Sequence, residues 1–241
     1  MKFEIKTIGV VESCFKEKFG IPRQPGLVPE ARASIIIESP YDRDEAFYGL
    51  QVFSHIWVIF IFHQCIKEKW KPTVRPPRLG GNQRMGVFAS RSMFRPNPIG
   101  LSVLKLEGIR RENNRLRLDV SGVDLLDGTP VIDIKPYLPY AENIAEATGG
   151  YAPDVPDTVC EISFTDEALV QCRQHSVDYP QLQSLIVNLL KTDPRPAYYA
   201  ASNKEKVFAM KLLDFDLKWL HTDNGITVLS LDSGAIKSHN Q

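Results

Sequence analysis

The run VFSHIWVIFIF at residues 52–62 constrains the fold more than any other part of this sequence. Both its odd and its even positions are mostly apolar, so a strand built from it would present apolar side chains on both faces. Such a strand belongs at the centre of a sheet or in the wall of a barrel, where both faces are covered. The run is too short to cross a bilayer, and Ser54, His55 and the following His63 interrupt its apolar character. We therefore expect a protein that does not insert into a membrane.

Shorter strand patterns surround this run within the first 140 residues. Leu116, Leu118 and Val120 alternate with polar residues, which is the period of a strand with one wet face. Similar runs are FEIKTIGVV, SIIIES, MGVFA, IGLSVLKLEGI and RLRLDVSGV, separated by proline, glycine and polar clusters. No long amphipathic helix lies between them, which argues against a Rossmann array. The pattern favours a mainly β fold built on a β-barrel.

The pattern changes after a small, polar, Gly- and Pro-rich stretch near residues 141–158, which we interpret as a linker. VCEISF is a short strand, and Thr165 can cap a helix behind it. A second helix is expected after Pro180 and ends before Pro194. Its apolar stripe is Leu182, Leu185, Ile186, Leu189 and Leu190. KVFAMKLLDFDLKWL and GITVLSL close the chain as strands. We thus predict a barrel domain over residues 1–145 and a small α+β domain over residues 155–241.

Charge is distributed unevenly in a chain whose formal net charge is zero. Residues 1–150 carry 21 Lys and Arg against 17 Asp and Glu (+4), and residues 151–241 carry 8 against 12 (−4). Between residues 67 and 95 the only acid is Glu68, against eight basic residues: Lys67, Lys69, Lys71, Arg75, Arg78, Arg84, Arg91 and Arg95. This local excess suits a polyanion such as nucleic acid, and solvated loop charge explains it equally well.

The cysteines do not form a recognisable metal or disulfide pattern. Cys14, Cys65, Cys160 and Cys172 are scattered, and neither CxxC nor HxxxH occurs. We expect four reduced thiols and no metal site. The opening MKFEIKTIGVV lacks the basic and apolar regions of a secretory signal. Together these features predict a cytoplasmic protein.

The stretch RSMFRPNPIGLS at residues 91–102 is a stiff, arginine-bearing loop ahead of a strand. Pro96 and Pro98 fix φ and hold Arg95 and Asn97 extended. Rigid placement of an arginine suits recognition of an anion or a base, because less freedom is lost on binding. The same residues also suit a simple proline-rich turn. Neither GxxxxGK[ST] nor GxGxxG is present, so no common nucleotide motif explains the stretch.

A second polar cluster follows the turn signal Asp127–Gly128. Asp133 and Lys135 are two residues apart on an expected strand, so both point to the same face, next to Tyr137. This arrangement suits acid–base chemistry, but an ordinary surface ion pair has the same pattern. His63 and Gln64, at the end of the apolar run, are candidates to line a pocket.

The segments PRQPGL, FSHIW, RPPRLGG, GVFASRSMFRPNPIG, DGTPVIDIKPYLP and DPRPAY together resemble the TsaA-like family, also called TrmO. The resemblance extends from about residue 5 to residue 198. It implies a β-barrel, S-adenosylmethionine-dependent tRNA methyltransferase acting on N6 of N6-threonylcarbamoyladenosine, just 3′ of the anticodon. It also implies a homodimer with the cofactor near the subunit interface. Met93 departs from the family, which often has Pro or Thr at this position.

The resemblance also assigns candidate site residues. The cofactor would contact Pro25, Gly26, Leu27, His63, Gln64, Arg91, Leu101, Leu126, Asp127, Gly128 and Thr129. We expect Asp133 or Tyr137 to accept a proton, with Lys135 beside them. The anticodon stem-loop would be held by Arg78, Arg95, Asn97, Arg195 and Tyr198, although the DPRPAY segment with Arg195 can equally serve to dock the C-terminal domain. Two alternatives stay open: a non-enzymatic β-barrel RNA-binding module, and a methyltransferase with the same cofactor and another substrate.

Overall fold

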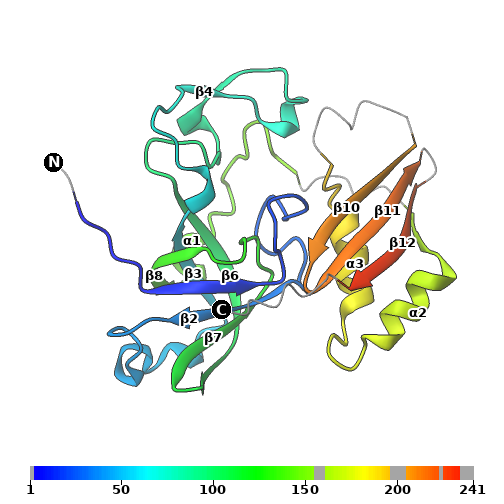
Figure 1. The fold of residues 1–241 in the computed structure, drawn as a ribbon. Coiled ribbons are helices and arrows are strands. Elements are labelled where there is room, and N and C mark those ends of the chain that lie inside the picture. Colours follow the sequence, from blue (N-terminus) through cyan, green and yellow to red (C-terminus); the bar gives the residue numbers. More distant parts are fainter. Residues whose placement is uncertain (1–2, 155–160, 196–204, 223–224, 234–241) are drawn as a thin grey trace.

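The computed structural model describes residues 3–154, 161–195, 205–222 and 225–233, and it contains a closed barrel and a separate four-stranded sheet (Figure 1). The barrel closes in the order β1-β2-β7-β6-β3-β8. Its strands are β1 (Gly9–Ser13), β2 (Arg32–Ile37), β3 (His55–Ile61), β6 (Ile99–Glu112), β7 (Arg115–Ser121) and β8 (Pro130–Pro136). All neighbouring strands are antiparallel.

Strand β3 is a wall strand of this barrel, as its sequence predicts. It pairs with β6 on one side and β8 on the other. Ile56, Val58 and Phe60 point into the barrel and are buried, whereas Trp57 and Ile59 face outward and are only partly buried. The outer face of β3 therefore stays apolar and partly open to solvent.

Two of the predicted strands, FEIKTIGVV and MGVFA, differ from the prediction: the first is shorter, and the second is shorter and lies outside the barrel. Residues 3–8 of FEIKTIGVV form no strand, and β1 begins only at Gly9. In MGVFA, β5 (Met85–Gly86) pairs with β4 (Thr73–Val74), and Val87–Ala89 turns into a 3-10 helix. The six barrel strands already close on themselves, which leaves no free edge for a longer strand from this segment.

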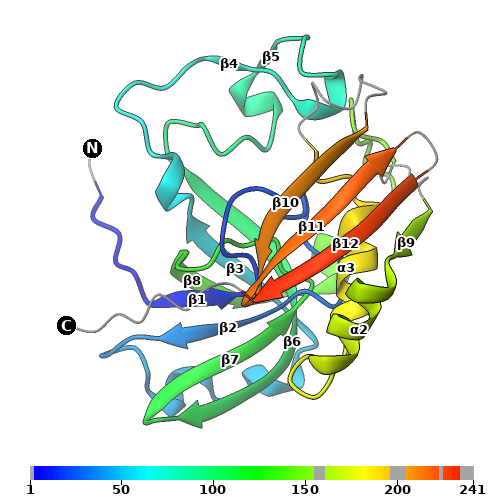
Figure 2. The ribbon, with the colours of Figure 1, turned by 45° about the vertical axis from the view of Figure 1, so that its right-hand side comes forward.

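The C-terminal part is a small sheet covered by two helices (Figure 2). Its strands run in the order β10 (Lys206–Leu212), β11 (Phe215–Thr222), β12 (Gly225–Ser233) and β9 (Ile162–Phe164), with β9 parallel to β12. The helices are α2 (Asp166–Gln174) and α3 (Leu182–Lys191), and a single turn, α1 (Pro139–Glu142), overlaps the start of the predicted linker. Thr165 caps α2 by accepting a hydrogen bond from the Ala168 amide at 3.2 Å. The predicted cap is confirmed.

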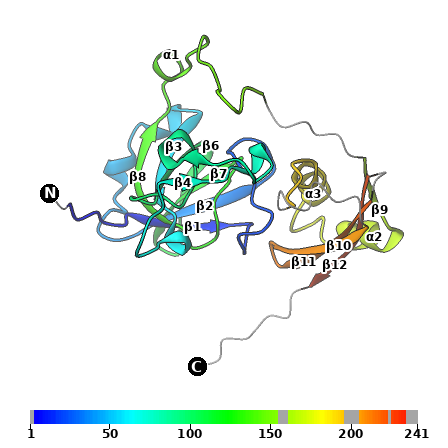
Figure 3. The same ribbon diagram turned by 90° about the horizontal axis from the view of Figure 1, so that it is seen from above.

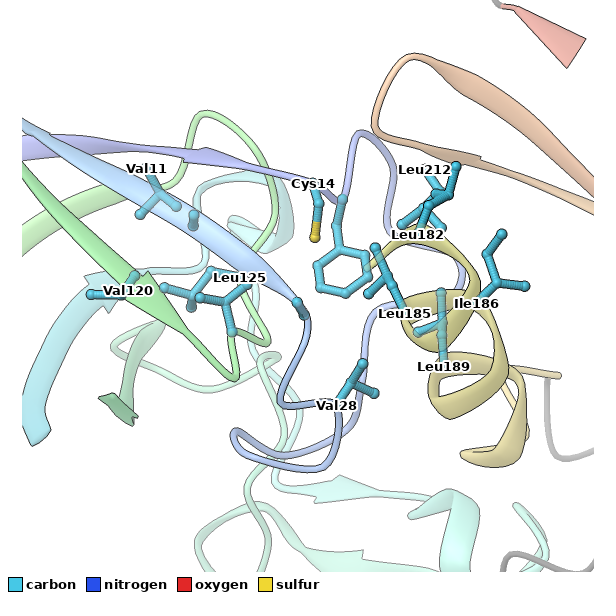
Figure 4. Close-up of a cluster of buried hydrophobic side chains, with 14 of the residues drawn as sticks. Val11, Cys14, Val28, Val120, Leu125, Leu182, Leu185, Ile186, Leu189 and Leu212 are labelled. Carbon is cyan, nitrogen blue, oxygen red and sulfur yellow. The ribbon is translucent and has the colours of Figure 1, made fainter. Parts of the chain in front are cut away.

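Helix α3 lies between the barrel and the C-terminal sheet (Figure 3). All five residues of its predicted apolar stripe are buried. They meet residues that follow β1, including Cys14 and Val28, so one continuous apolar core joins the two parts (Figure 4). Phe15, also fully buried, makes a backbone bridge to Leu212 at the end of β10. The two parts are therefore packed against each other rather than merely tethered.

Cys14, Cys65 and Cys172 are free and buried, while Cys160 lies outside the described residues. Burial raises the pKa of the Cys14 thiol to about 12, which keeps it protonated and unreactive. No helix in the described ranges is long and apolar enough to span a bilayer.

Candidate functional site

The loop between β1 and β2 crosses one end of the barrel and carries the predicted segment Pro25, Gly26 and Leu27. The Gly26 amide donates a hydrogen bond of 2.8 Å to the carbonyl of Gly122, just beyond β7. Gly26 has a φ of 78°, and a Cβ on Gly122 would lie only 3.2 Å from its Cα. The positive φ favours glycine at position 26, and the missing side chain of Gly122 allows the close approach. The loop is thus fixed against the end of β7.

Arg91 connects this loop to strand β6. Its Nη1 donates to the side-chain oxygen of Gln24, and its Nη2 donates to the carbonyl of Leu101 at 3.3 Å. The guanidinium is exposed, and it carries five N–H donors, so further donors remain for a ligand. Three separate segments with predicted cofactor residues therefore meet around Arg91.

A partly buried carboxyl group that is absent from the sequence-based candidates lies beside them. Ser102 donates a 2.7 Å hydrogen bond to Asp124. Burial raises the pKa of Asp124 to about 6, against the opposing effects of the Ser102 hydrogen bond and the positive charge of Arg91. This polar site could have been suspected from the sequence, because Ser102 is a polar residue at an inward-facing position between Gly100 and Leu104.

The turn of Leu126, Asp127, Gly128 and Thr129 is tied to β1. Asp127 accepts a hydrogen bond from the Ser13 amide at 2.8 Å and forms a 3.1 Å ion pair with Lys16. The Gly128 amide donates to the Val11 carbonyl at 2.8 Å, and Thr129 bonds back to Leu126 through its hydroxyl at 2.7 Å. The Asp127 carboxylate therefore has a structural role in holding this turn.

His63 and Gln64 lie in a 3-10 helix, His63–Cys65, directly after β3. The ammonium of Lys18 donates to the Gln64 carbonyl at 2.7 Å, which ties this helix to the same loop after β1. The preceding Phe62 amide donates to the Pro98 carbonyl at 2.8 Å. Every segment with predicted cofactor residues is thus linked to the loop after β1, to β1 itself, or to β6.

Of the predicted catalytic residues, Asp133 and Lys135 lie on the outer face of β8, and Tyr137 directly follows this strand. Ile59 of β3 is paired with Leu101 on one side and with Asp133 on the other, so Asp133 is about 10 Å from Leu101 across two strand spacings. Lys135 and Asp133 form an ion pair of 2.6 Å, with 64% and 48% of their side chains exposed. The ring of Tyr137 contacts Trp57 at a centroid distance of 6.0 Å. The three residues are neighbours, and they lie two strands away from Leu101.

The predicted substrate residues are less clustered. Arg95 donates to the Ser90 and Ser92 carbonyls at 3.1 and 3.4 Å and so braces its own loop. Arg78 donates to the Asp154 carbonyl in the linker at 2.6 Å. Asn97 is exposed at the tip that precedes β6.

Arg195 is held by the adjacent Asp193 through two hydrogen bonds of 2.7 and 2.9 Å, and only 12% of its side chain is exposed. Its carbonyl accepts a 3.3 Å hydrogen bond from Arg23, in the loop after β1. These contacts support the docking role for this segment. Tyr198 lies outside the described residues.

Within the described ranges, no group of three or more His, Cys, Asp or Glu residues could hold a metal ion.

Comparison with protein families shows which family this chain belongs to. Residues 10–143 match the tRNA-methyltransferase O N-terminal domain, and residues 157–234 match the TrmO C-terminal domain. The chain belongs to the TrmO family. The mainly β architecture with its barrel also matches solved TrmO structures: a crystal structure of TrmO from Pseudomonas aeruginosa, 38% identical, covers 97% of this chain and 99% of its own, with a TM-score of 0.77.

Curated TrmO relatives extend this similarity. A tRNA (adenine(37)-N6)-methyltransferase of Escherichia coli K12 is 47% identical over 230 residues, which cover 95% of this chain and 98% of the relative. A tRNA (adenine(37)-N6)-methyltransferase of Mus musculus is 46% identical over 133 residues, 54% of this chain and 30% of the mouse protein.

Proposed function

We propose that this protein is an S-adenosylmethionine-dependent methyltransferase that acts on tRNA. Its target is N6 of the adenosine 3′ to the anticodon, in the form of N6-threonylcarbamoyladenosine. The observation that carries the proposal is the similarity, over nearly its whole length, to a relative named tRNA (adenine(37)-N6)-methyltransferase. The contacts that join three of the predicted cofactor segments at Arg91 support it.

The donor groups at the end of the barrel fit S-adenosylmethionine. Arg91 has free N–H groups for the methionine carboxylate, and Leu27 and Leu101 offer apolar contacts for the remainder of the molecule. The carbonyls of the turn at residues 126–129 suit a positive sulfonium. When bound, the cofactor supplies an electrophilic methyl group. His63 and Gln64, which directly follow β3, complete the set.

The target nitrogen needs help to react. In N6-threonylcarbamoyladenosine, N6 belongs to a urea, so its lone pair is delocalised but its proton is comparatively acidic. Asp133 or Tyr137 accepts that proton, and Lys135 pairs with Asp133 and helps to hold the threonyl carboxylate. Arg78, Arg95 and Asn97 contact the ribose-phosphate backbone. Alignment of N6 with the methyl group supplies most of the rate.

We further propose that the protein works in the cytoplasm as a homodimer and contacts the anticodon stem-loop. The outer face of β3 and β6 supports a subunit interface there, because Trp57, Ile59, Val103 and the 48%-exposed Leu101 form an apolar surface beside the site. The division into domains at residues 1–145 and 155–241 is part of the same proposal. It agrees with the ranges of the two family models.

Calorimetry with S-adenosylmethionine, followed by mass spectrometry of tRNA from a deletion strain, tests the function. We expect cofactor binding by the purified protein and loss of the N6-methyl group from tRNA in the strain, with recovery when the gene is restored. Binding of RNA without cofactor would favour the non-enzymatic RNA-binding module instead. Cofactor binding with unchanged tRNA would favour another substrate.

A further inference from the structure

The segment between β3 and β6 extends from the barrel (Figure 1). It carries exposed aromatic rings that the site described above does not use. Trp70 is 49% exposed and Phe88 is 73% exposed. The ribbon of β4 and β5 brings them together, and the Val87 amide continues the pairing by donating to the Pro72 carbonyl at 2.9 Å. Val87 itself is buried and anchors the ribbon.

Trp70 and Phe88 form a pair on the surface. Their ring centroids are 6.2 Å apart and the ring planes are inclined by 39°. Two large aromatic side chains gain less stability from such a position than from burial, because about half of Trp70 and most of Phe88 stay in water. Their place is better explained by a ligand that covers them.

The charges around the pair indicate what that ligand is. Among the described residues, the side chains of Lys69, Lys71, Arg75 and Arg84 have no ion pair or hydrogen bond. Lys67 lies over the ring of Phe94, with its ammonium 4.5 Å from the centroid. Aromatic rings among unpaired cations are typical of surfaces that bind single-stranded nucleic acid, where bases stack and phosphates meet positive charge.

We propose that Trp70 and Phe88 form a stacking platform for an unpaired base of the tRNA anticodon loop, with Lys69, Lys71, Arg75 and Arg84 contacting the adjacent phosphates. This inference rests on the proposed function, and it adds the surface that holds the loop. A second copy of this chain is a poor occupant. Residues 67–95 carry eight positive charges against one negative charge, so two such surfaces repel each other.

The test compares Trp70→Ala and Phe88→Ala with Tyr48→Ala. Tyr48 is 90% exposed and lies between β2 and β3, outside this segment, so it is a matched control for losing an exposed ring. Affinities are measured for an RNA anticodon stem-loop and for a fully paired duplex of the same stem. We expect each platform variant to lose roughly 5- to 150-fold in affinity for the stem-loop and little for the duplex, with Tyr48→Ala unchanged.

Salt dependence separates stacking from charge. The platform variants should keep the wild-type slope of log Kd against log salt, because they leave every phosphate contact in place. Lys69→Ala combined with Arg84→Ala should instead reduce the slope by about 0.7 for each phosphate of the single strand that the protein no longer neutralises. Circular dichroism and melting temperature check that the variants fold. Wild-type affinity of both platform variants for the stem-loop would overturn the inference. A change of oligomeric state in Trp70→Ala would also overturn it, in favour of contact between copies.

The failure of this inference is distinguishable from failure of the proposed function. If wild-type protein methylates tRNA while both platform variants keep its affinity and KM for tRNA, the platform is wrong and the enzyme stands. If wild-type protein binds the stem-loop through Trp70 but does not methylate it, the platform is right and the enzymatic proposal is wrong.

Discussion

Ser102 of β6 donates a 2.7 Å hydrogen bond to Asp124, which follows β7, and this bond joins two barrel segments next to Arg91. Asp124 is flanked in the sequence by two fully buried residues, Val123 and Leu125. Burial disfavours its charged form and raises its pKa to about 6. A partly neutral carboxyl near pH 6 is therefore built into the wall of the candidate site.

Asp124→Asn should change how stability depends on pH. The pKa of Asp124 is higher in the folded protein than its ordinary value of 3.8, so between about pH 4 and pH 6 the folded state binds more protons than the unfolded state. The wild type then loses stability as pH rises through this window, and the variant lacks that loss. We expect the free energy of unfolding of the variant, relative to wild type, to increase by up to about 3 kcal/mol between pH 4 and pH 7.

Urea denaturation at pH 4.5 and pH 7.5 measures this difference. Asp232→Asn is a control without this pH dependence, because the hydrogen bond from Lys218 lowers the pKa of Asp232 in the folded protein and its carboxyl is therefore ionised at both pH values. An equal difference between Asp124→Asn and wild type at both pH values would contradict the expected burial of the charge.

Arg91→Lys should weaken binding of S-adenosylmethionine by about 10- to 100-fold. The guanidinium of Arg91 bonds to both Gln24 and Leu101 and still has donors for a carboxylate, and a lysine ammonium cannot do all three. Isothermal titration calorimetry gives the Kd. Arg95→Lys is the matched control, since Arg95 braces its own loop through the Ser90 and Ser92 carbonyls. A Kd of Arg91→Lys within twofold of wild type would remove Arg91 from the cofactor site.

Much of the fold could be predicted because its signals are local. The two apolar faces of β3, the Thr165 cap and the α3 stripe each depend on residues within one element. The hydrogen bond between Ser102 and Asp124 could not be predicted in this way, because it joins residues 22 positions apart that meet only when the barrel closes. Periodicity identifies a polar residue on an apolar face, but it does not identify the partner.

The segments outside the regular elements were harder to predict for a related reason. MGVFA has the composition of a strand, yet only Met85–Gly86 forms one, because strand formation depends on an available edge. Arg195 has the sequence context of a binding residue, but its guanidinium donates hydrogen bonds to the carboxylate of Asp193, two residues earlier. The availability of a charge for a ligand depends on its neighbours in space.

Asp133→Asn tests the proposed proton acceptor. If Asp133 is the general base, single-turnover methylation at saturating tRNA should fall by about 10²- to 10⁴-fold. Lys135→Met is the companion variant, because it removes the ion-pair partner but leaves the carboxylate. Both residues are exposed, so we expect the free energy of unfolding to change by less than about 0.5 kcal/mol. A rate loss below about threefold for Asp133→Asn would exclude this role and leave Tyr137 as the candidate.

The shared core between barrel and C-terminal sheet predicts one cooperative unfolding transition for the whole chain. Leu185 of α3 is 4% exposed and belongs to the cluster that also contains Cys14 and Val28 (Figure 4). Leu185→Ala should lower the free energy of unfolding by about 2–5 kcal/mol, because it removes buried methyl groups and leaves a cavity. Both parts should unfold together at the lower denaturant concentration, since the core that this variant weakens is common to them.

Val170→Ala is the control for this variant. Val170 lies on α2 and is 43% exposed, so its truncation should change the free energy of unfolding by less than about 0.5 kcal/mol. Urea titrations monitored by circular dichroism and by tryptophan fluorescence report on both parts, because Trp57 lies in the barrel and Trp219 lies in the C-terminal sheet. Two separate transitions in wild type would show that the parts unfold independently. If wild type unfolds in one transition, deletion of residues 151–241 would expose the apolar surface around Phe15 and Val28 and would destabilise the barrel. Point variants such as Arg195→Ala are therefore the better test of whether the C-terminal part contacts RNA.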